Sequence, residues 1–304
     1  MQFSLIIETF TFLEGGSRSR FCKLLERASA IVGGSAHGEL LVADVVGTEE
    51  LAEILRAFPA SQRIDAVGLP YDTAKMRAFA ASSGRYILYI DSDCLPGPGW
   101  EQHMLAALRQ DGVIACCGFT MYEGGFWSKA MDVMDWGFIY PRTRHPVGCY
   151  VSNNCGFRRE ALQQVPMPQT EIRCACYLHA QMFMRRGTPM MLVPEAFALH
   201  EVQPLIRERS RRGYDLIAAC WADPAAREAR WLRCGALAPL RFYAANLAED
   251  WRRLRLVRRD LRLSGLHTAT VAVVLPLLRL IDLAGMIRAM MRGPEPQGWG
   301  GWAW

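Results

Sequence analysis

The chain has 304 residues, of which 51% are hydrophobic and 21% are charged. This composition is that of a globular protein, and the length suffices for one large α/β domain or two smaller ones. The net charge of +5 comes almost wholly from arginine, because lysine occurs only at Lys23, Lys75 and Lys129. We find no P-loop and no glycine-rich dinucleotide motif. The arginines are densest in one short segment without a recognition motif, which argues against a nucleic-acid partner.

The first half of the chain alternates between strand-like and helix-like segments. Near-continuous apolar strands that alternate with helices are typical of a mainly parallel sheet with helices on both faces. Thr48 is the expected N-cap of the second helix, and Gly84 the expected end of the third. Strands are predicted at 3–10, 38–46, 63–69, 85–91 and 113–122, and helices at 19–32, 48–58, 72–84 and 99–112.

The second half is less regular. An amphipathic helix is expected from residue 126, followed by a loop rich in Gly, Pro and Asn that reaches the "FRREAL" helix start. A helix over 176–187 and a strand-like run that ends at His200 come next. From Pro224 onward the composition changes to arginine-rich and then apolar helices. We therefore predict a catalytic domain over 1–223, a helical extension over 224–292 and a disordered tail over 293–304.

The ten cysteines do not by themselves imply disulfides. The first residues, "MQFSLIIETF", have no basic region and no small-residue cleavage site, and they predict a β-strand rather than a signal peptide. We therefore expect free thiols and a protein located in the cytoplasm, either in solution or at the cytoplasmic face of the inner membrane.

Two aspartates follow the apolar run "YILYI" directly. Asp91 and Asp93 stand one residue apart at the end of a predicted strand, and Asp44 ends another. Ligands bind at the carboxyl ends of strands in such sheets. Paired carboxylates offer hard oxygen ligands to Mg²⁺ or Mn²⁺, and such a metal neutralises a diphosphate leaving group. The alternative is an Asx-turn in which the carboxylates cap backbone amides.

The segment "GRYILYIDSDCLPGPGW" resembles the D-x-D region of family 2 glycosyltransferases with the GT-A fold. Five other segments resemble this family in the expected order, so that the resemblance covers roughly residues 3 to 215. They are "SLIIETF", "LLVADVV", "YDTAKMRAFAASSG", "VSNNCGFRREAL" and "MFMRRGTPMMLVPEAFALHE". The resemblance implies a Rossmann-like GT-A domain, a divalent metal and a nucleotide-sugar donor.

The resemblance also implies roles for individual residues. Asp91 and Asp93 would bind the metal together with the ribose and diphosphate of the donor, and His200 would approach the metal or the diphosphate. Ordinary helix charges, strand-end caps and turn formers are the alternatives. The other implied roles are base contact for Asp44, phosphate contact for Lys75 and Arg77, and the acceptor side for Asn153 and Asn154.

The sequence departs from the family pattern in two places. The first strand ends in "IIETF" instead of "IPTYN", so Glu8 either contacts the donor base or ribose or faces solvent. The Glu-Asp pair that supplies the base in inverting members would fall near Ala175 and Cys176. Neither residue can take a proton from an acceptor hydroxyl. Glu171 is the favoured base, His179 is the alternative, and a catalytically degenerate domain is the third interpretation.

The C-terminal segment mixes arginine with apolar residues. "WRRLRLVRRDLRL" is typical of a basic amphipathic helix at a membrane surface. The following apolar stretch has only eleven uncharged residues before Arg279, and a span needs about twenty. We expect either a peripheral membrane contact through 251–291 or a helical pair packed on the catalytic domain.

Two functions from different classes remain at this point. The first is a metal-assisted glycosyltransferase of hexosyltransferase type, which moves a sugar from a UDP- or GDP-sugar to a glycan or lipid-linked acceptor with inversion, in polysaccharide or glycolipid synthesis. The second is a non-catalytic nucleotide-sugar-binding or scaffold protein on a degenerate GT-A domain. Sugar transfer or donor hydrolysis would separate them.

Overall fold

The structure is a computed structural model that describes residues 2–13, 16–34, 37–139, 143–169, 175–202, 205–222 and 227–293. These residues pack into two compact units. The first unit comprises Met1–Met121, Arg142–Thr170 and Ala175–Glu201, and the second comprises Tyr122–Pro141, Glu171–Cys174 and Val202–Trp304, each as far as it is described.

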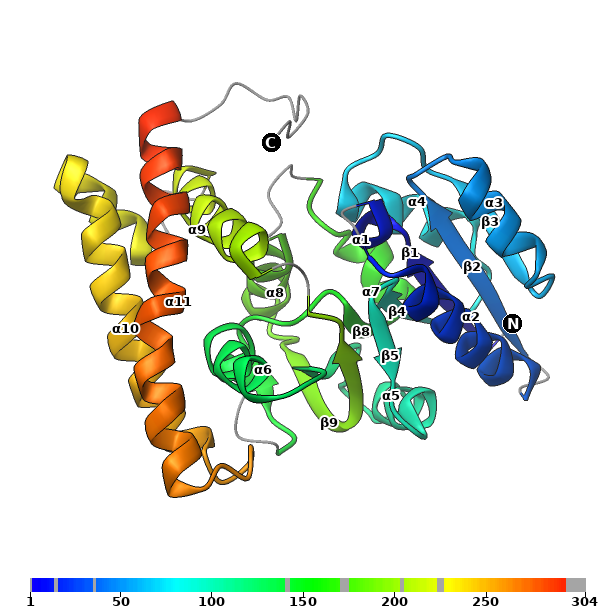
Figure 1. Cartoon of the computed structure of the whole chain (residues 1–304). Helices are drawn as coiled ribbons and strands as arrows, with labels where there is room; N and C mark the ends of the chain where they lie inside the picture. Colours follow the sequence, from blue (N-terminus) through cyan, green and yellow to red (C-terminus); the bar gives the residue numbers. More distant parts are fainter. Residues whose placement is uncertain are drawn as a thin grey trace. The chain divides into compact units, whose positions relative to one another are not determined.

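One mixed sheet forms the centre of the first unit (Figure 1). In the described residues the strands follow the order β3-β2-β1-β4-β8-β6-β9-β5, and β7 pairs with β9. The strands β3, β2, β1 and β4 are mutually parallel, whereas β8 runs antiparallel to both β4 and β6, and β9 antiparallel to β5 and β7. The strand bounds are Phe3–Glu8, Gly38–Asp44, Ser61–Asp65, Tyr86–Asp91, Cys94–Pro96, Ala115–Tyr122, Pro146–Val147, Asn154–Arg158 and Met190–His200 for β1 to β9.

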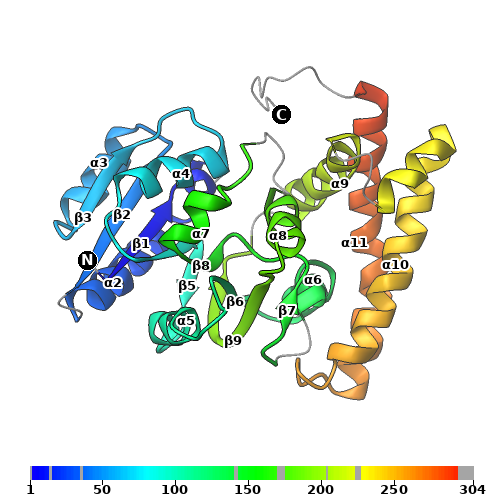
Figure 2. The same ribbon diagram turned by 180° about the vertical axis from the view of Figure 1, so that it is seen from behind.

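Helices cover both faces of the sheet, as the sequence predicts. The main core lies between one face and α2, α3 and α5, where alternate strand residues such as Leu5, Val42 and Leu88 pack with Leu24 and Trp100. Figure 2 shows α4 and α7 on the opposite face. Thr48 is confirmed as the N-cap of α3, and α4 ends three residues before Gly84. The helices of this unit are α1 Phe10–Leu13, α2 Arg18–Gly33, α3 Glu49–Arg56, α4 Tyr71–Ala81, α5 Trp100–Leu108, α7 Arg159–Gln164 and α8 Ala175–Arg185.

The structure has the strand β8 over Asn154–Arg158, so the predicted loop is wrong over Asn154–Gly156 and the predicted helix start is wrong over Phe157 and Arg158. Gly156 fits there because a Cβ at this position would lie 2.9 Å from Leu88 Cδ2. Asn154 fits because its side chain accepts a hydrogen bond from Trp100 Nε1 and donates to the carbonyls of Phe119 and Ala196. Residues that locally favour a turn thus form a strand because tertiary partners satisfy them.

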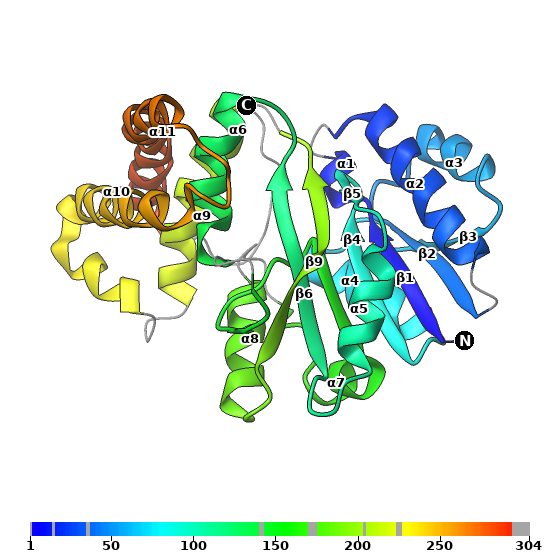
Figure 3. The same ribbon diagram turned by 90° about the horizontal axis from the view of Figure 1, so that it is seen from below.

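The second unit is helical. Its helices are α6 Phe126–Met131, the π-helix η1 Asp132–Trp136, the 3-10 helices η2 Gly137–Ile139 and η3 Arg227–Leu237, and α9 Leu205–Ala222, α10 Ala238–Val257 and α11 Gly265–Arg292. Helix α11 packs against both α9 and α10 (Figure 3). The domain boundary near residue 223 stays a prediction. Helix α9, which precedes this boundary in the chain, packs with the helical unit. The tail predicted to be disordered lies outside the described residues, apart from Gly293.

Helix α11 alone among the described helices is long and apolar enough to cross a membrane by length and composition. Its most apolar 18-residue window has a mean hydropathy of 2.0 and is 44% buried inside the structure. Core helices of soluble proteins can meet the same criterion, so the contacts of α11 must decide what this helix does.

Candidate functional site

Acidic residues from four parallel strands lie at the carboxyl edge of the sheet. Glu8 ends β1 and pairs in register with Asp91 at the end of β4, while Asp44 ends β2 beside Asp65 of β3. Glu8, Asp44 and Asp91 are all buried. The edge at which α/β sheets bind their ligands therefore carries the residues predicted from the sequence.

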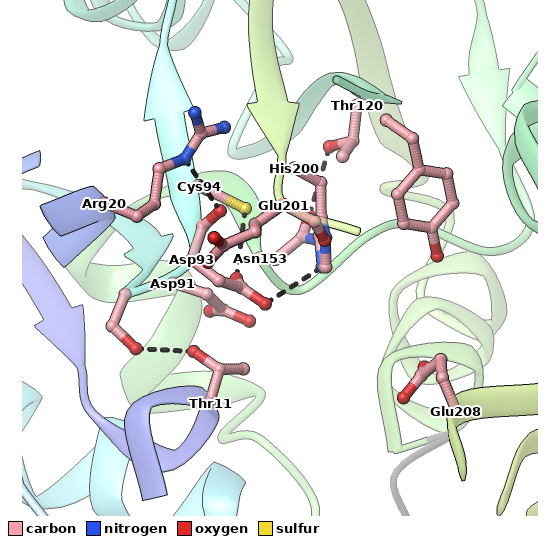
Figure 4. Close-up of polar contacts among 12 residues, drawn as sticks. Thr11, Arg20, Asp91, Asp93, Cys94, Thr120, Asn153, His200, Glu201 and Glu208 are labelled. Atoms are coloured by element: carbon pink, nitrogen blue, oxygen red, sulfur yellow. Dashed lines mark hydrogen bonds and ion pairs between the residues drawn. The ribbon is translucent and has the colours of Figure 1, made fainter. Parts of the chain in front are cut away.

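Asp93 and His200 face each other just beyond this edge (Figure 4). The His200 Nε2 atom lies 3.4 Å from Asp93 Oδ2, and both side chains are buried. The His200 Nδ1 atom lies 2.6 Å from the carbonyl oxygen of Glu201, which can only accept, so Nδ1 carries a proton. In a neutral imidazole, Nε2 then presents a lone pair toward a carboxylate oxygen. Two electron-pair donors at this distance require a proton or a cation between them.

A divalent cation fits this arrangement. A metal-binding histidine usually donates its other ring N–H to a backbone carbonyl, as His200 does here. The thiol of Cys94 lies close to the same place, because one ligand atom each from Asp93, Cys94 and His200 lie within 4.8 Å of one another. Burial, and next the negative charge of Asp93, raise the pKa of Cys94 well above its usual value. The sequence did not single out Cys94.

A framework of hydrogen bonds holds the Asp93 segment in place. The Glu201 backbone N–H donates to the Asp93 carbonyl at 2.9 Å, and the guanidinium of buried Arg20 donates to the carbonyls of Asp93 and Leu199. Between the two aspartates, Ser92 shares a 2.5 Å hydrogen bond with Thr11. Arg20 was missed in the sequence because it resembles any other arginine of an amphipathic helix.

Asp91, predicted as a second metal ligand, is instead held by an ion pair. Lys75 Nζ donates to Asp91 Oδ1 at 2.8 Å, and Tyr71 Oη donates to Asp91 Oδ2 at 2.6 Å. Lys75 also donates to the carbonyl of Ser152 at 2.7 Å. Burial disfavours the ammonium, but the negative charge of Asp91 outweighs this effect and raises the pKa of Lys75. Both Asp91 oxygens thus have donors on them, and the prediction of a metal role fits Asp93 better.

Glu8 is fully buried beside this ion pair. Its Oε2 accepts a hydrogen bond from the Phe10 N–H, whereas its Oε1 has no hydrogen-bond partner among the described residues. Burial, and next the negative charge of Asp91, raise the pKa of Glu8 well above its usual value. The side chain does not face solvent, which removes one of the two alternatives for this residue. A protonated Glu8 has a donor to offer at the ligand edge.

Asp44 and Arg77 differ in their surroundings. Asp44 accepts hydrogen bonds from the N–H groups of Val46 and Gly47 on Oδ1, and Arg63 contacts its Oδ2 through both Nε and Nη2. Asp44 therefore caps the turn after β2, as the alternative interpretation expects, and it lies at the ligand edge, so base contact stays a prediction. Arg77 is exposed on α4 and makes no contact with these residues, so the structure does not bring it to the edge with Lys75.

The two asparagines predicted on the acceptor side have structural partners. Asn154 is fully buried in β8 with its whole amide hydrogen-bonded, so it cannot line an acceptor site in this arrangement. Asn153 is 5% exposed and accepts a hydrogen bond from Thr120, and its backbone carbonyl accepts one from Asp91 N. Asn153 thus remains at the edge of the site.

His179, the alternative base, lies in the aromatic core of the first unit. Its Nδ1 contacts Tyr150 Oη and its Nε2 contacts the Val165 carbonyl, both at 2.8 Å. Burial lowers the pKa of His179 to about 4. A neutral imidazole with both nitrogens engaged cannot accept a proton from a substrate here, so this prediction loses its basis. Glu171, the favoured base, lies outside the described residues.

Comparisons with known proteins agree with this geometry. Residues 39–165, which contain Asp44, Lys75, Asp91 and Asp93, match the family model described as glycosyl transferase family 2. A search of curated proteins finds no match.

Solved structures share the fold at low sequence identity. A mannosyltransferase from Pyrobaculum calidifontis, in complex with GDP-Man and Mn²⁺, is 13% identical with a TM-score of 0.62, over 96% of this chain and 87% of its own. Glucosyl-3-phosphoglycerate synthase from Mycobacterium tuberculosis, with Mn²⁺, UDP-glucose and phosphoglyceric acid, is 18% identical with a TM-score of 0.51, over 69% and 75%. These structures confirm the predicted GT-A fold class, and the match to the model of glycosyl transferase family 2 covers residues 39–165.

Proposed function

We propose that the protein transfers a sugar from a UDP- or GDP-sugar to a hydroxyl of a glycan or lipid-linked acceptor. The observation that carries this proposal is the Asp93–His200 pair, which offers a carboxylate oxygen and an imidazole nitrogen as ligands for a cation next to the family-matched strand ends. The similar structures bind GDP-Man or UDP-glucose together with Mn²⁺, which supports the same donor class here.

The proposed role of each residue follows from its charge. Asp93 and His200 would hold Mn²⁺ or Mg²⁺, which supplies positive charge to the donor diphosphate when it is bound. Lys75 neutralises Asp91, so that the edge does not repel the diphosphate with a second full negative charge. Glu8 offers a hydrogen bond from a neutral carboxyl, which suits a ribose hydroxyl or a base carbonyl. The hydroxyl of the acceptor needs a base, and Glu171 is the proposed one.

The test is ligand-induced thermal stabilisation by UDP and by GDP, with and without Mn²⁺. We compare the wild type with Asp93→Asn and His200→Gln, and use Asp111→Asn as the control because Asp111 is exposed and lies after α5, away from the strand ends. A ligand at about 100 times its Kd stabilises the folded state by about 2.7 kcal/mol. We expect this stabilisation to need Mn²⁺, to persist in Asp111→Asn and to be lost in the other two variants. A folded wild type that responds to neither nucleotide would refute the donor site.

A second function is favoured by one observation. Ala175 and Cys176 begin α8 where the family pattern has its acidic pair, so the domain could bind a nucleotide sugar without transferring it. Donor hydrolysis or transfer to an added glycan, measured with radiolabelled UDP- and GDP-sugars, separates the two. Turnover that falls about 100-fold or more in Glu171→Gln supports the enzyme and its base. Mn²⁺-dependent nucleotide binding without turnover supports the scaffold.

A further inference from the structure

Helix α11 buries two of its charged residues, Arg279 and Asp282, on one side. Asp282 receives a bidentate pair from Arg209 of α9, with both distances 2.7 Å, and Arg279 forms a bidentate pair with Asp250 of α10 at 2.6 and 2.8 Å. Arg279 also contacts Asp282 at 2.7 Å. These two residues would be costly at the centre of a membrane as free charges. The structure shows that they face the neighbouring helices and are neutralised there.

The opposite side of α11 is an exposed apolar stripe. It repeats at intervals of three, four and seven residues, which places its members along one helix face. Thr270 and Ala284 fill the intervals, so no charged residue interrupts the stripe. At about 1.5 Å per residue, it runs for roughly 37 Å. Figure 3, which looks nearly along α11, shows α6, α9 and α10 grouped to one side of it. The stripe consists of Leu266, Val273, Leu277, Leu280, Ile287 and Met291, which are 44% to 82% exposed.

Unpaired arginines stand at the beginning of this stripe. Arg255, Arg258, Arg259 and Arg262 lie at the end of α10 and in the connection to α11; all are exposed and have no ion pair with any residue that the structure describes. By contrast, Arg252 pairs with Glu249. The indole of Trp251 donates a hydrogen bond to the Ala272 carbonyl, so this half-exposed aromatic ring lies beside the stripe.

We infer that α11, with the arginines before it, is a docking surface for an anionic lipid bilayer. The helix lies in the plane of the interface, with its stripe at the boundary between headgroups and acyl chains and the arginines on the lipid phosphates. The combination of a wide apolar face, an aromatic flank and uncompensated positive charge matches this partner.

Two other occupants fit less well. A second copy of the chain would bring two arginine groups together, and α11 has no acidic residue to pair with them, since its only one, Asp282, is buried. A spanning α11 would carry its bound neighbours Arg209 and Asp250 with it, and with them the exposed charges of α10 such as Arg241 and Arg252. An in-plane helix keeps the ion pairs within the protein.

Vesicle flotation of the full chain tests this inference. The vesicles are phosphatidylcholine alone or an equal mixture with phosphatidylglycerol. We expect binding to the mixed vesicles that is reversed by high salt or an alkaline wash. The stripe variant Val273→Glu/Leu277→Glu/Leu280→Glu should bind about 100-fold more weakly or worse on either vesicle. The arginine variant Arg258→Gln/Arg259→Gln/Arg262→Gln should lose about 100-fold on the mixed vesicles only, that is, about 1 kcal/mol per arginine.

The matched control removes three exposed arginines of the first unit, Arg109→Gln/Arg185→Gln/Arg186→Gln, and should bind like the wild type. All substituted positions are exposed, and unfolding midpoints check that each variant folds. Retention after the alkaline wash would overturn the in-plane helix in favour of a span. A lipid-free dimer that the stripe variant converts to a monomer, together with no vesicle binding, would overturn it in favour of a second copy. Nucleotide binding is not used, so failure of this inference leaves the proposed function standing, and the converse also holds.

Discussion

Lys75 and Asp91 show how single residues shape the proposed donor site. Both side chains are almost wholly buried, and each satisfies the other at 2.8 Å. A buried ion pair gains little over an apolar pair of the same shape, but removal of one partner leaves a charge without compensation. We interpret the pair as a device that keeps one carboxylate at the ligand edge without leaving its charge exposed to a diphosphate.

Lys75→Met should therefore destabilise the protein by about 3–5 kcal/mol, because it leaves Asp91 buried without its cation. The measurement is urea unfolding. Lys75→Met/Asp91→Leu, which removes both charges, should regain much of the loss, and Lys23→Met at an exposed position of α2 should change the unfolding free energy by less than about 0.5 kcal/mol. Equal midpoints for Lys75→Met and the wild type would show that the pair contributes nothing.

At the scale of elements, two glycines allow α9 and α11 to pack backbone to backbone. A Cβ at Gly213 would lie 1.9 Å from the Asp282 carbonyl oxygen, and one at Gly285 would lie 1.8 Å from that of Ser210. The close approach also brings Arg209 and Asp282 within hydrogen-bond distance. The close packing of α9 on α11, the helix that carries the apolar stripe, thus depends on glycine at both positions.

Gly285→Ala should force the two helices apart and lower the free energy of unfolding by about 1–3 kcal/mol or more, although alanine is the better helix former. Gly265→Ala is the matched control in the first residue of α11, where a Cβ meets nothing within 4 Å. It should be neutral or stabilising by up to about 1 kcal/mol. Circular dichroism during urea unfolding measures both, and a Gly285→Ala variant as stable as Gly265→Ala would contradict the close packing.

At the scale of the whole molecule, buried acids decide how stability responds to pH. Asp132 of η1 accepts a hydrogen bond from the Tyr122 N–H at 2.7 Å, while its pair with Lys129 is long, at 3.5 Å. Burial raises the pKa of Asp132 from 3.8 to about 7. Between these two values the folded state keeps a proton that the unfolded chain has lost. Its contribution to stability is therefore present below the unfolded pKa and is lost as pH rises through this window.

Asp132→Asn should remove this dependence while it keeps the acceptor for Tyr122. The variant should gain stability relative to the wild type by up to about 1.4 kcal/mol per pH unit between pH about 4 and 7, and no more above that. Unfolding midpoints measured across this range, with exposed Asp111→Asn as control, provide the check. Profiles for Asp132→Asn and the wild type that run parallel would mean that Asp132 is ionised throughout.

The sequence by itself determined most of the parallel half of the sheet, because strands β1, β2 and β4 are apolar runs that alternate with helices, a pattern that depends on neighbours in the chain. It also placed Asp44, Asp91 and Asp93 at strand ends, since a strand ends where its apolar run does. It could not separate the roles of Asp91 and Asp93, because their partners Lys75 and His200 come from α4 and β9.

Only the tertiary structure decided what depends on distant partners. It made β8 a strand by giving Asn154 and Gly156 buried neighbours, placed His179 in an aromatic core, and turned Arg279 and Asp282 of α11 inward to Arg209 and Asp250. Local sequence carries propensity and periodicity, whereas the protonation of a carboxyl group, the exposure of a helix face and the pairing of a charge depend on which side chains meet across the fold.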